Sequence, residues 1–298
     1  MNIQLFKYLE TNTMQPAGTN PEILQSQVID LLRFPLIVGV VFIHINLLAV
    51  NGGPDAGLDW DSFSVYQVCR QLFSGVLTAV AVPLFFIISG FLFFRNIDFS
   101  KQVYIKKLSS RMRTLLIPYL FWNFVAFLLH FVIHSIPALK ALSHRIVDFS
   151  LMQIFWGKVV DNTLEALPIS GQFWFIRDLM VLVVLTPFVY VYVKKLGACG
   201  ILLLNVLWIF DWWFTLPGLS IMAVFFFTLG AWVSISKRNL VMEAEKVKYP
   251  ILILYPALVI ADLLTKGNGA NPFIHNIGIL LGLLFWLNVG ASSIRTMV

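Results

Sequence analysis

Two ionisable side chains share one apolar segment near the start of the chain. Arg33 and His44 lie 11 residues apart in a stretch that is otherwise almost wholly apolar. On an α-helix, at about 100° per residue, this spacing places both side chains on one face, about 16 Å apart along the axis. An arginine binds phosphate through parallel hydrogen bonds, and an imidazole, whose ordinary pKa is near neutrality, can accept a proton from a hydroxyl group. The pair could therefore bind an anion and carry out acid–base chemistry.

A structural interpretation of the same residues stays open beside the functional one. Asp30 precedes Arg33 by three residues, close enough on a helix to hold its guanidinium. Arg33 would then be an anchor at a membrane surface, and His44 would form a hydrogen bond between helices. Ionisable residues inside apolar spans are costly, which makes each of them a candidate for function as well.

The composition indicates which elements must position these side chains. Of the 298 residues, 59% are hydrophobic and 12% are charged, whereas a soluble globular chain has about 25% charged residues. A soluble enzyme is therefore excluded, and such apolarity is incompatible with a disordered chain or a disulfide scaffold. We expect an all-α fold, a polytopic bundle of transmembrane helices.

Eight apolar windows approach the roughly 20 residues that a helix needs to cross a bilayer. The predicted spans are approximately 31–50, 76–94, 114–136, 173–193, 198–214, 218–236, 249–264 and 274–290. The first 25 residues are polar and contain no apolar run of their own. We therefore expect an N-terminal tail over residues 1–25, followed by a membrane-embedded domain over residues 26–298.

Basic residues are distributed unevenly among the predicted loops. Thirteen Lys and Arg residues fall in the loops on one side of the membrane or after the last span, and five fall on the other side. The side richer in positive charge faces the cytoplasm, so both termini and the N-terminal tail are predicted to be cytoplasmic. The net charge of +6 is thus an orientation signal, and no nucleic-acid partner is expected.

Four short motifs follow one another in the first two thirds of the chain. They are Asp30-Leu-Leu-Arg33 followed by His44, Val82-Pro-Leu-Phe-Phe-Ile-Ile-Ser-Gly-Phe91, Arg111-Met-Arg113 leading into Ile117-Pro-Tyr-Leu-Phe-Trp122, and Phe173-Trp-Phe-Ile-Arg177-Asp-Leu179. In this order they resemble the acyltransferase 3 family of bacterial integral-membrane O-acyltransferases. The remainder of the chain is similar to the family mainly in its hydropathy.

The resemblance implies an enzyme that transfers an acyl group, commonly acetyl from cytoplasmic acetyl-CoA, to a hydroxyl group of a glycan. The glycan would be an envelope or extracellular polysaccharide or its lipid-linked precursor. The resemblance also implies a multi-pass protein of the bacterial inner or plasma membrane, in contact with lipid, and no metal ion is expected. Members of the family usually carry more than eight spans, so the domain is expected to be incomplete at its C-terminus.

The resemblance also assigns roles to individual residues. The motif that contains Arg and His falls on Arg33 and His44, so His44 is expected to be the general base. Arg33 and Asp30 are expected to be catalytic as well, and the spacing of Asp30 would let it hold the Arg33 guanidinium. The family's basic stretch falls directly before the third span. The residues expected to bind the phosphates of acetyl-CoA are Arg33, Lys107, Arg111 and Arg113.

The fourth motif has two interpretations. Trp174, Arg177 and Asp178 lie at the predicted outer end of a span. They could form the acceptor site, with Trp174 covering a sugar face and the charged pair bonding sugar hydroxyls. They could equally be an interfacial tryptophan beside a local ion pair.

Two other functions remain open at this point. A polytopic transporter or flippase of a glycan precursor would use Arg33, His44 and Arg177 to line a conducting path. No internal repeat is evident, although many transporters have one. An acyltransferase could also use succinyl-CoA or another acyl thioester in place of acetyl-CoA.

Overall fold

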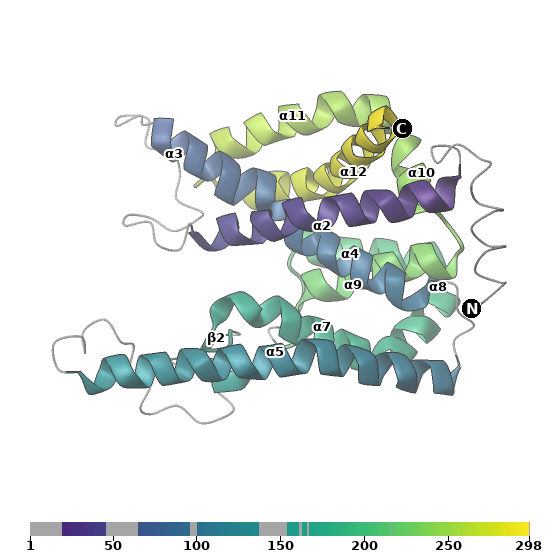
Figure 1. The fold of residues 1–298 in the computed structure, drawn as a ribbon. Coiled ribbons are helices and arrows are strands. Elements are labelled where there is room, and N and C mark those ends of the chain that lie inside the picture. Colours follow the sequence, from purple (N-terminus) through teal and green to yellow (C-terminus); the bar gives the residue numbers. More distant parts are fainter. Residues whose placement is uncertain are drawn as a thin grey trace. The chain divides into compact units, whose positions relative to one another are not determined.

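The fold is almost entirely helical (Figure 1). The computed structural model describes residues 20–45, 65–95, 100–136, 154–160, 163–165, 167–214 and 216–297. Within these residues the only strands are β1 (Lys158–Val160) and β2 (Thr163–Glu165), which form one short antiparallel hairpin. The predicted all-α class is confirmed.

Among the described residues, six helical segments are long and apolar enough to cross a membrane. They are Pro21–His44, Val65–Phe94, Lys101–Ser135, Thr186–Ile209, Lys248–Thr265 and Asn271–Met297, and Ile221–Ile235 is a shorter apolar helix. The predicted multi-pass membrane protein is confirmed by these segments.

The first helix, α2 (Pro21–Ile45), begins earlier than the predicted span. Asn20 caps it, because its side-chain oxygen accepts a hydrogen bond from the Glu22 amide at 2.9 Å. Pro21 is suited to a first helical position because its missing N–H would be unpaired there in any case. Leu24 and Gln25 are buried, so residues 21–25 belong to the helix and not to the expected tail. The predicted end of this span, residues 46–50, lies outside the described residues.

The predicted span 173–193 is not one continuous helix, because it contains α7 and the start of α8. Helix α7 (Trp174–Val184) ends at Leu185, and α8 (Thr186–Ile209) starts directly afterwards. Pro187 cannot donate a hydrogen bond to the Val183 carbonyl, and the Thr186 hydroxyl donates to that carbonyl instead, at 2.8 Å. The proline therefore breaks a segment that is continuous in hydropathy.

The predicted loop between residues 193 and 198 is reduced to a single break. Gly197 has φ 52° and ψ −132°, inside the range of α8. A glycine tolerates this positive φ at little cost, since it has no Cβ atom. The two halves of α8 are therefore separate helical segments joined at one residue.

The chain forms two compact units, and the first contains both ends of the described chain. This unit comprises the residues up to Phe85 and from Ser236 onward. Its elements are α2, α3 (Val65–Arg70), a π-helical turn (Gln71–Val76), a 3-10 turn (Leu77–Val80), the start of α4 (Ala81–Phe94), α10 (Leu240–Glu245), α11 (Lys248–Thr265) and α12 (Asn271–Met297). Helices α11 and α12 pack against each other, and α12 also packs against α2.

The second unit runs from Phe86 to Ile235. It contains the rest of α4, α5 (Lys101–Ser135), the β-hairpin, a 3-10 turn (Gly171–Phe173), α7, α8 and α9 (Ile221–Ile235). Helices α4 and α9 meet at two glycines: a Cβ atom on Gly90 would lie 2.1 Å from the Phe227 carbonyl oxygen, and one on Gly230 would lie 2.0 Å from that of Ile87. Only glycine permits this approach of two helix backbones.

Candidate functional site

Helix α2 carries the Asp30–Arg33 pair on its surface. The Asp30 carboxylate lies 3.0 Å from the Arg33 guanidinium, as the spacing of three residues predicts. The two side chains are 61% and 54% exposed, so the ion pair orients the guanidinium without burying it. An exposed, oriented guanidinium can still offer its other N–H groups to an anion.

His44 lies close to the C-terminal end of the same helix. Its side chain is half-buried, and Ile37 and Val41, which lie between it and Arg33 on the helix face, are exposed. This face of α2 is therefore outside the packed core of the first unit. Arg33 and His44 keep the shared face that their spacing predicts, because α2 is helical from one residue to the other.

Lys107 of α5 contacts the end of another helix. Its ammonium group donates hydrogen bonds to the carbonyl oxygens of Phe93 and of Leu92, the second at 3.4 Å, and lies 5.2 Å from the Phe93 ring centroid. These carbonyls are among the last of α4, where a cation is favoured by the helix dipole. Lys107 thus joins α5 to α4, and one of its three N–H groups is left for a phosphate.

Arg111 and Arg113 are both exposed on α5, but they do not point the same way. Two residues on a helix are separated by about 200°, so the two guanidinium groups leave opposite sides of α5. Arg111 shares a side with Lys107, four residues earlier. Within the described part of the chain, neither guanidinium makes a hydrogen bond or ion pair. Lys107 and Arg111 therefore lie on the same side of α5, and Arg113 lies on the other side.

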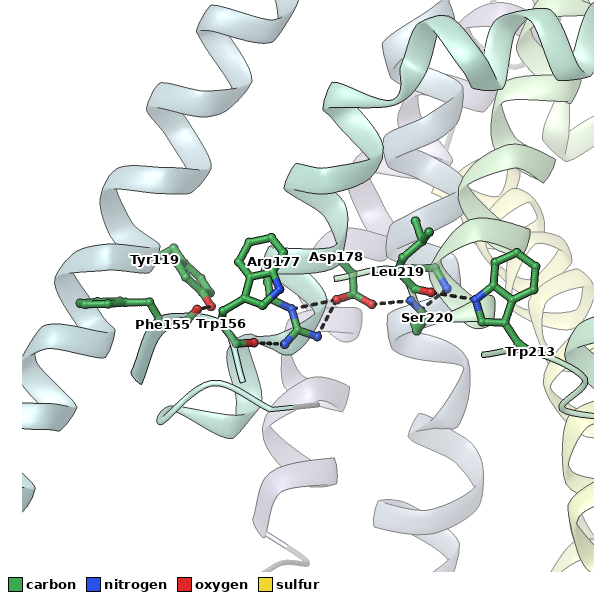
Figure 2. Close-up of polar contacts among 9 residues, drawn as sticks. Tyr119, Phe155, Trp156, Arg177, Asp178, Trp213, Leu219 and Ser220 are labelled. Atoms are coloured by element: carbon green, nitrogen blue, oxygen red, sulfur yellow. Dashed lines mark hydrogen bonds and ion pairs between the residues drawn. The ribbon is translucent and has the colours of Figure 1, made fainter. Parts of the chain in front are cut away.

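Arg177 and Asp178 form a buried ion pair at the start of α7 (Figure 2). Two guanidinium nitrogens donate to one Asp178 oxygen, Nη2 at 2.8 Å and Nε at 3.1 Å. The side chain of Arg177 is 2% exposed and that of Asp178 is not exposed at all. Such a pair is stable only when its remaining polar atoms are also satisfied.

Main-chain groups from two distant segments satisfy those atoms. The Arg177 Nη1 donates to the Trp156 carbonyl, and the guanidinium lies 5.8 Å from the Trp156 ring centroid. The second Asp178 oxygen accepts a hydrogen bond from the Ser220 amide at 3.1 Å, and the Trp213 indole donates to the neighbouring Leu219 carbonyl at 2.9 Å (Figure 2). The ion pair therefore joins α7 to the chain before β1 and to the start of α9.

Helix α5 is joined to the same region by a second polar chain. The Tyr119 hydroxyl donates to the Phe155 carbonyl, one residue before Trp156 (Figure 2). Asn123 is fully buried, donates to the Tyr119 carbonyl at 2.8 Å and accepts from the Ser170 amide at 3.2 Å. Sequence reasoning did not identify these residues. Asn123 could have been identified as a polar residue within the apolar segment 114–136.

This geometry separates the residues of the fourth motif. Arg177 and Asp178 have almost no surface with which to meet a sugar hydroxyl, so their contacts are those of the local ion pair. Trp174 is half-buried, and its ring lies 6.4 Å from that of Phe86. Of the three, only Trp174 has surface left for a ligand.

The residues expected to act together belong to different units. Arg33 and His44 are in the first unit, whereas Lys107, Arg111, Trp174 and the buried pair are in the second. In the described ranges, no three His, Cys, Asp or Glu side chains are grouped as a metal site would require.

Most of the chain is similar to proteins of a known family. Residues 27–297 match the model of a protein family described as "Acyltransferase domain". The "Succinoglycan biosynthesis protein ExoH" of Rhizobium meliloti (strain 1021) is 27% identical over 169 residues, which are 56% of this chain and 43% of that protein. The match thus spans less than half the length of this curated relative. No solved structure matches the chain.

Proposed function

Because the chain belongs to the acyltransferase 3 family, we propose that it is a membrane-bound O-acyltransferase. Its donor is acetyl-CoA from the cytoplasm, and its acceptor is a hydroxyl group of an envelope or extracellular glycan or of the lipid-linked precursor. The observation that carries this proposal is the family match over residues 27–297, which includes every residue assigned a role here. A relative named for succinoglycan biosynthesis supports a glycan acceptor.

The donor binds through its phosphates. Arg33 offers an exposed guanidinium held by Asp30, and Arg111 offers another beside Lys107. Arginine binds phosphate through two parallel N–H groups, whereas a lysine acts as a point charge. In the second unit, Arg111 is thus the principal phosphate ligand, and Lys107 adds its positive charge. Arg33 is the phosphate ligand that the family resemblance assigns in the first unit. Arg113 has a lesser role because it leaves the opposite side of α5.

His44 is the general base of the transfer. Its imidazole takes the proton of the acceptor hydroxyl as the hydroxyl oxygen forms a bond to the thioester carbonyl carbon. The carbon–sulfur bond then breaks, and coenzyme A leaves as a thiolate. The imidazolium returns the proton to that thiolate, so the base is restored and no proton is gained or lost.

Arg177 and Asp178 position the acceptor site without touching the acceptor. Their bonds to Trp156 and Ser220 fix the start of α7, where Trp174 lies. Trp174 is the residue of this group that contacts the sugar, because an aromatic ring packs well on the apolar face of a pyranose. The charged pair thereby supports a binding residue on a rigid helix.

The identity of the acyl group has a second candidate. The relative's name refers to succinoglycan, which favours succinyl-CoA as the alternative donor. Both donors carry the same phosphates, so the arginine contacts serve either one. A transporter or flippase is disfavoured, because the family match covers residues 27–297 and includes all the predicted spans.

Deletion of the gene tests the proposal in the cell. Glycans are released from the surface of the deletion strain and of a strain complemented with the wild-type gene, and their acyl groups are measured by mass spectrometry. We expect an acetyl ester to be lost on deletion and restored by complementation. Loss of a succinyl ester alone would replace the donor, and unchanged acylation of every surface glycan would contradict the proposal.

A further inference from the structure

A second buried polar cluster lies in the first unit, between α11 and α12. Asp262 is its centre and is almost fully buried. One carboxylate oxygen lies 3.2 Å from the Lys266 ammonium and accepts a hydrogen bond from the side-chain amide of Asn271 at 2.7 Å. The other oxygen lies 2.7 Å from Nδ1 of His275. None of these residues has a role in the proposed transfer reaction described above.

The cluster fixes the orientation of one imidazole. A carboxylate can only accept hydrogen bonds, so Nδ1 of His275 carries the hydrogen and donates it to Asp262. Lys266 already balances the charge of Asp262, and the cluster therefore does not need a charged imidazole for neutrality. A neutral His275 presents Nε2 as a hydrogen-bond acceptor, and its side chain is 25% exposed.

The imidazole borders a small cavity. His275, Asp262, Tyr255 and Gly278 line it, together with apolar side chains, and its volume of about 10 Å³ holds one water-sized group. A Cβ atom on Gly278 would meet no other atom within 4 Å. The cavity is therefore polar on one side and apolar on the other, and the space beside Gly278 is open.

Tyr255, which lines this cavity, has a buried hydroxyl group without a hydrogen-bond acceptor among the described residues. The residue is 4% exposed, and its hydroxyl forms no hydrogen bond of normal geometry with any residue in the described part of the chain. The Trp286 indole is close enough to affect it, but an indole N–H can only donate, so the Tyr255 proton would still need an acceptor. A buried polar group in this state commonly marks the place of a water or a ligand.

The cluster lies toward the same end of the first unit as His44. Gln25 near the start of α2 accepts a hydrogen bond from the Leu240 amide of α10, and Lys248 at the start of α11 donates to Ser292 near the end of α12. These contacts place the start of α2, α10, the start of α11 and the end of α12 at one end of the unit. The opposite end holds the last turn of α2 with His44, the last turns of α11 and the first turns of α12 (Figure 1).

We propose that Tyr255, Asp262 and His275 form a subsite that binds a hydroxyl group of the sugar acceptor. The sugar hydroxyl donates to Nε2 of His275 and accepts from the Tyr255 hydroxyl, while Asp262 holds the imidazole. A hydroxyl is the ligand that both donates and accepts without bringing a charge to this neutral cluster. The subsite rests on the proposed function, because that function supplies the sugar acceptor. The acceptor would be held at the end of the unit where His44 lies.

Two variants separate this binding role from a structural one. Tyr255→Phe removes a hydroxyl whose proton has no acceptor among the described residues, so the stability of the fold should change little. Gly278→Ala adds a methyl group at the edge of the cavity, in open space where no other atom lies within 4 Å. The matched controls are Tyr249→Phe, at a residue that is 81% exposed, and Gly269→Ala, where a Cβ atom also meets nothing within 4 Å.

The experiment titrates the full chain in lipid nanodiscs with methyl β-D-glucopyranoside and follows binding by saturation-transfer NMR. We expect the dissociation constant to rise about fivefold in Tyr255→Phe, from the loss of one neutral hydrogen bond. We expect a rise of about tenfold in Gly278→Ala, because the added methyl group would narrow the open side of the cavity through which the sugar hydroxyl enters. Both controls should bind as the wild type does.

Two results would overturn the subsite. One is a wild-type protein that shows no saturable binding of the probe, and the other is wild-type affinity in both Tyr255→Phe and Gly278→Ala, as a resident water would give. Acyl transfer is measured separately on the same preparations. Sugar binding without any acyl transfer would contradict the proposed function alone, and transfer with unaltered binding in the variants would contradict the subsite alone.

Discussion

At the scale of single residues, the Arg177–Asp178 pair shows how context decides what a motif does. Both residues were candidates for direct contact with a sugar, and burial turns them toward the protein itself. Their partners, the Trp156 carbonyl and the Ser220 amide, come from segments that are distant in the sequence. Such partners are brought together by tertiary packing, so a local sequence pattern does not predict them.

The burial of this pair predicts a large difference between two similar substitutions. Asp178→Asn leaves the Arg177 guanidinium buried without a counter-charge, and we expect the free energy of unfolding to fall by about 3–5 kcal/mol. Asp30→Asn breaks an exposed pair of the same two residue types and should cost less than about 1 kcal/mol. Thermal unfolding in detergent measures both. Equal losses in the two variants would contradict the structural role of the buried pair.

The two arginines of the basic motif should differ in their effect on the donor. Arg111→Gln removes a charge-assisted contact to phosphate, and the KM for acetyl-CoA should rise about tenfold or more. Arg113→Gln is the matched control, because its guanidinium leaves the other side of α5, and its KM should rise less. Steady-state kinetics in proteoliposomes compare them. A larger effect at Arg113 would show that the donor lies on that side of the helix.

At the scale of elements, the contact of α4 with α9 depends on two glycines. In Gly230→Ala the added Cβ atom would meet the Ile87 carbonyl oxygen at 2.0 Å, so the two backbones must separate. We expect a destabilisation of about 1–3 kcal/mol, seen as a lower unfolding temperature. Gly171→Ala is the control, because its nearest neighbour would be a Leu167 methyl group at 3.8 Å. An unchanged unfolding temperature in Gly230→Ala would show that the helices do not meet there.

Hydropathy predicts where helices occur better than where they stop. Each of the six long apolar segments in the described residues overlaps a predicted apolar window, because burial in lipid requires long apolar runs. The boundaries depend on single residues: Asn20 and Pro21 start α2 early, and Pro187 divides the predicted span 173–193. The β-hairpin at Lys158–Glu165 was not predicted, since its strands are only three residues long.

At the scale of the whole molecule, the order of the four motifs carried the family assignment, and the match over residues 27–297 confirms it. The four motifs are divided between the two units. The Arg33 and His44 motif belongs to the first unit, the motif 82–91 crosses the boundary, and the other two motifs belong to the second unit. The Asp262–His275 cluster belongs to no motif at all. Residues 13 apart in the chain meet there only because α11 and α12 pack side by side.

The central claim is that His44 is the base of an acyl transfer. The most direct measurement compares acyl transfer from acetyl-CoA to glycan of the deletion strain by purified wild-type protein, His44→Ala and the control His134→Ala, all in proteoliposomes. The loss of a general base should lower the rate about a hundredfold or more in His44→Ala, with His134→Ala close to wild type. Transfer at the wild-type rate by a folded His44→Ala protein would contradict the account.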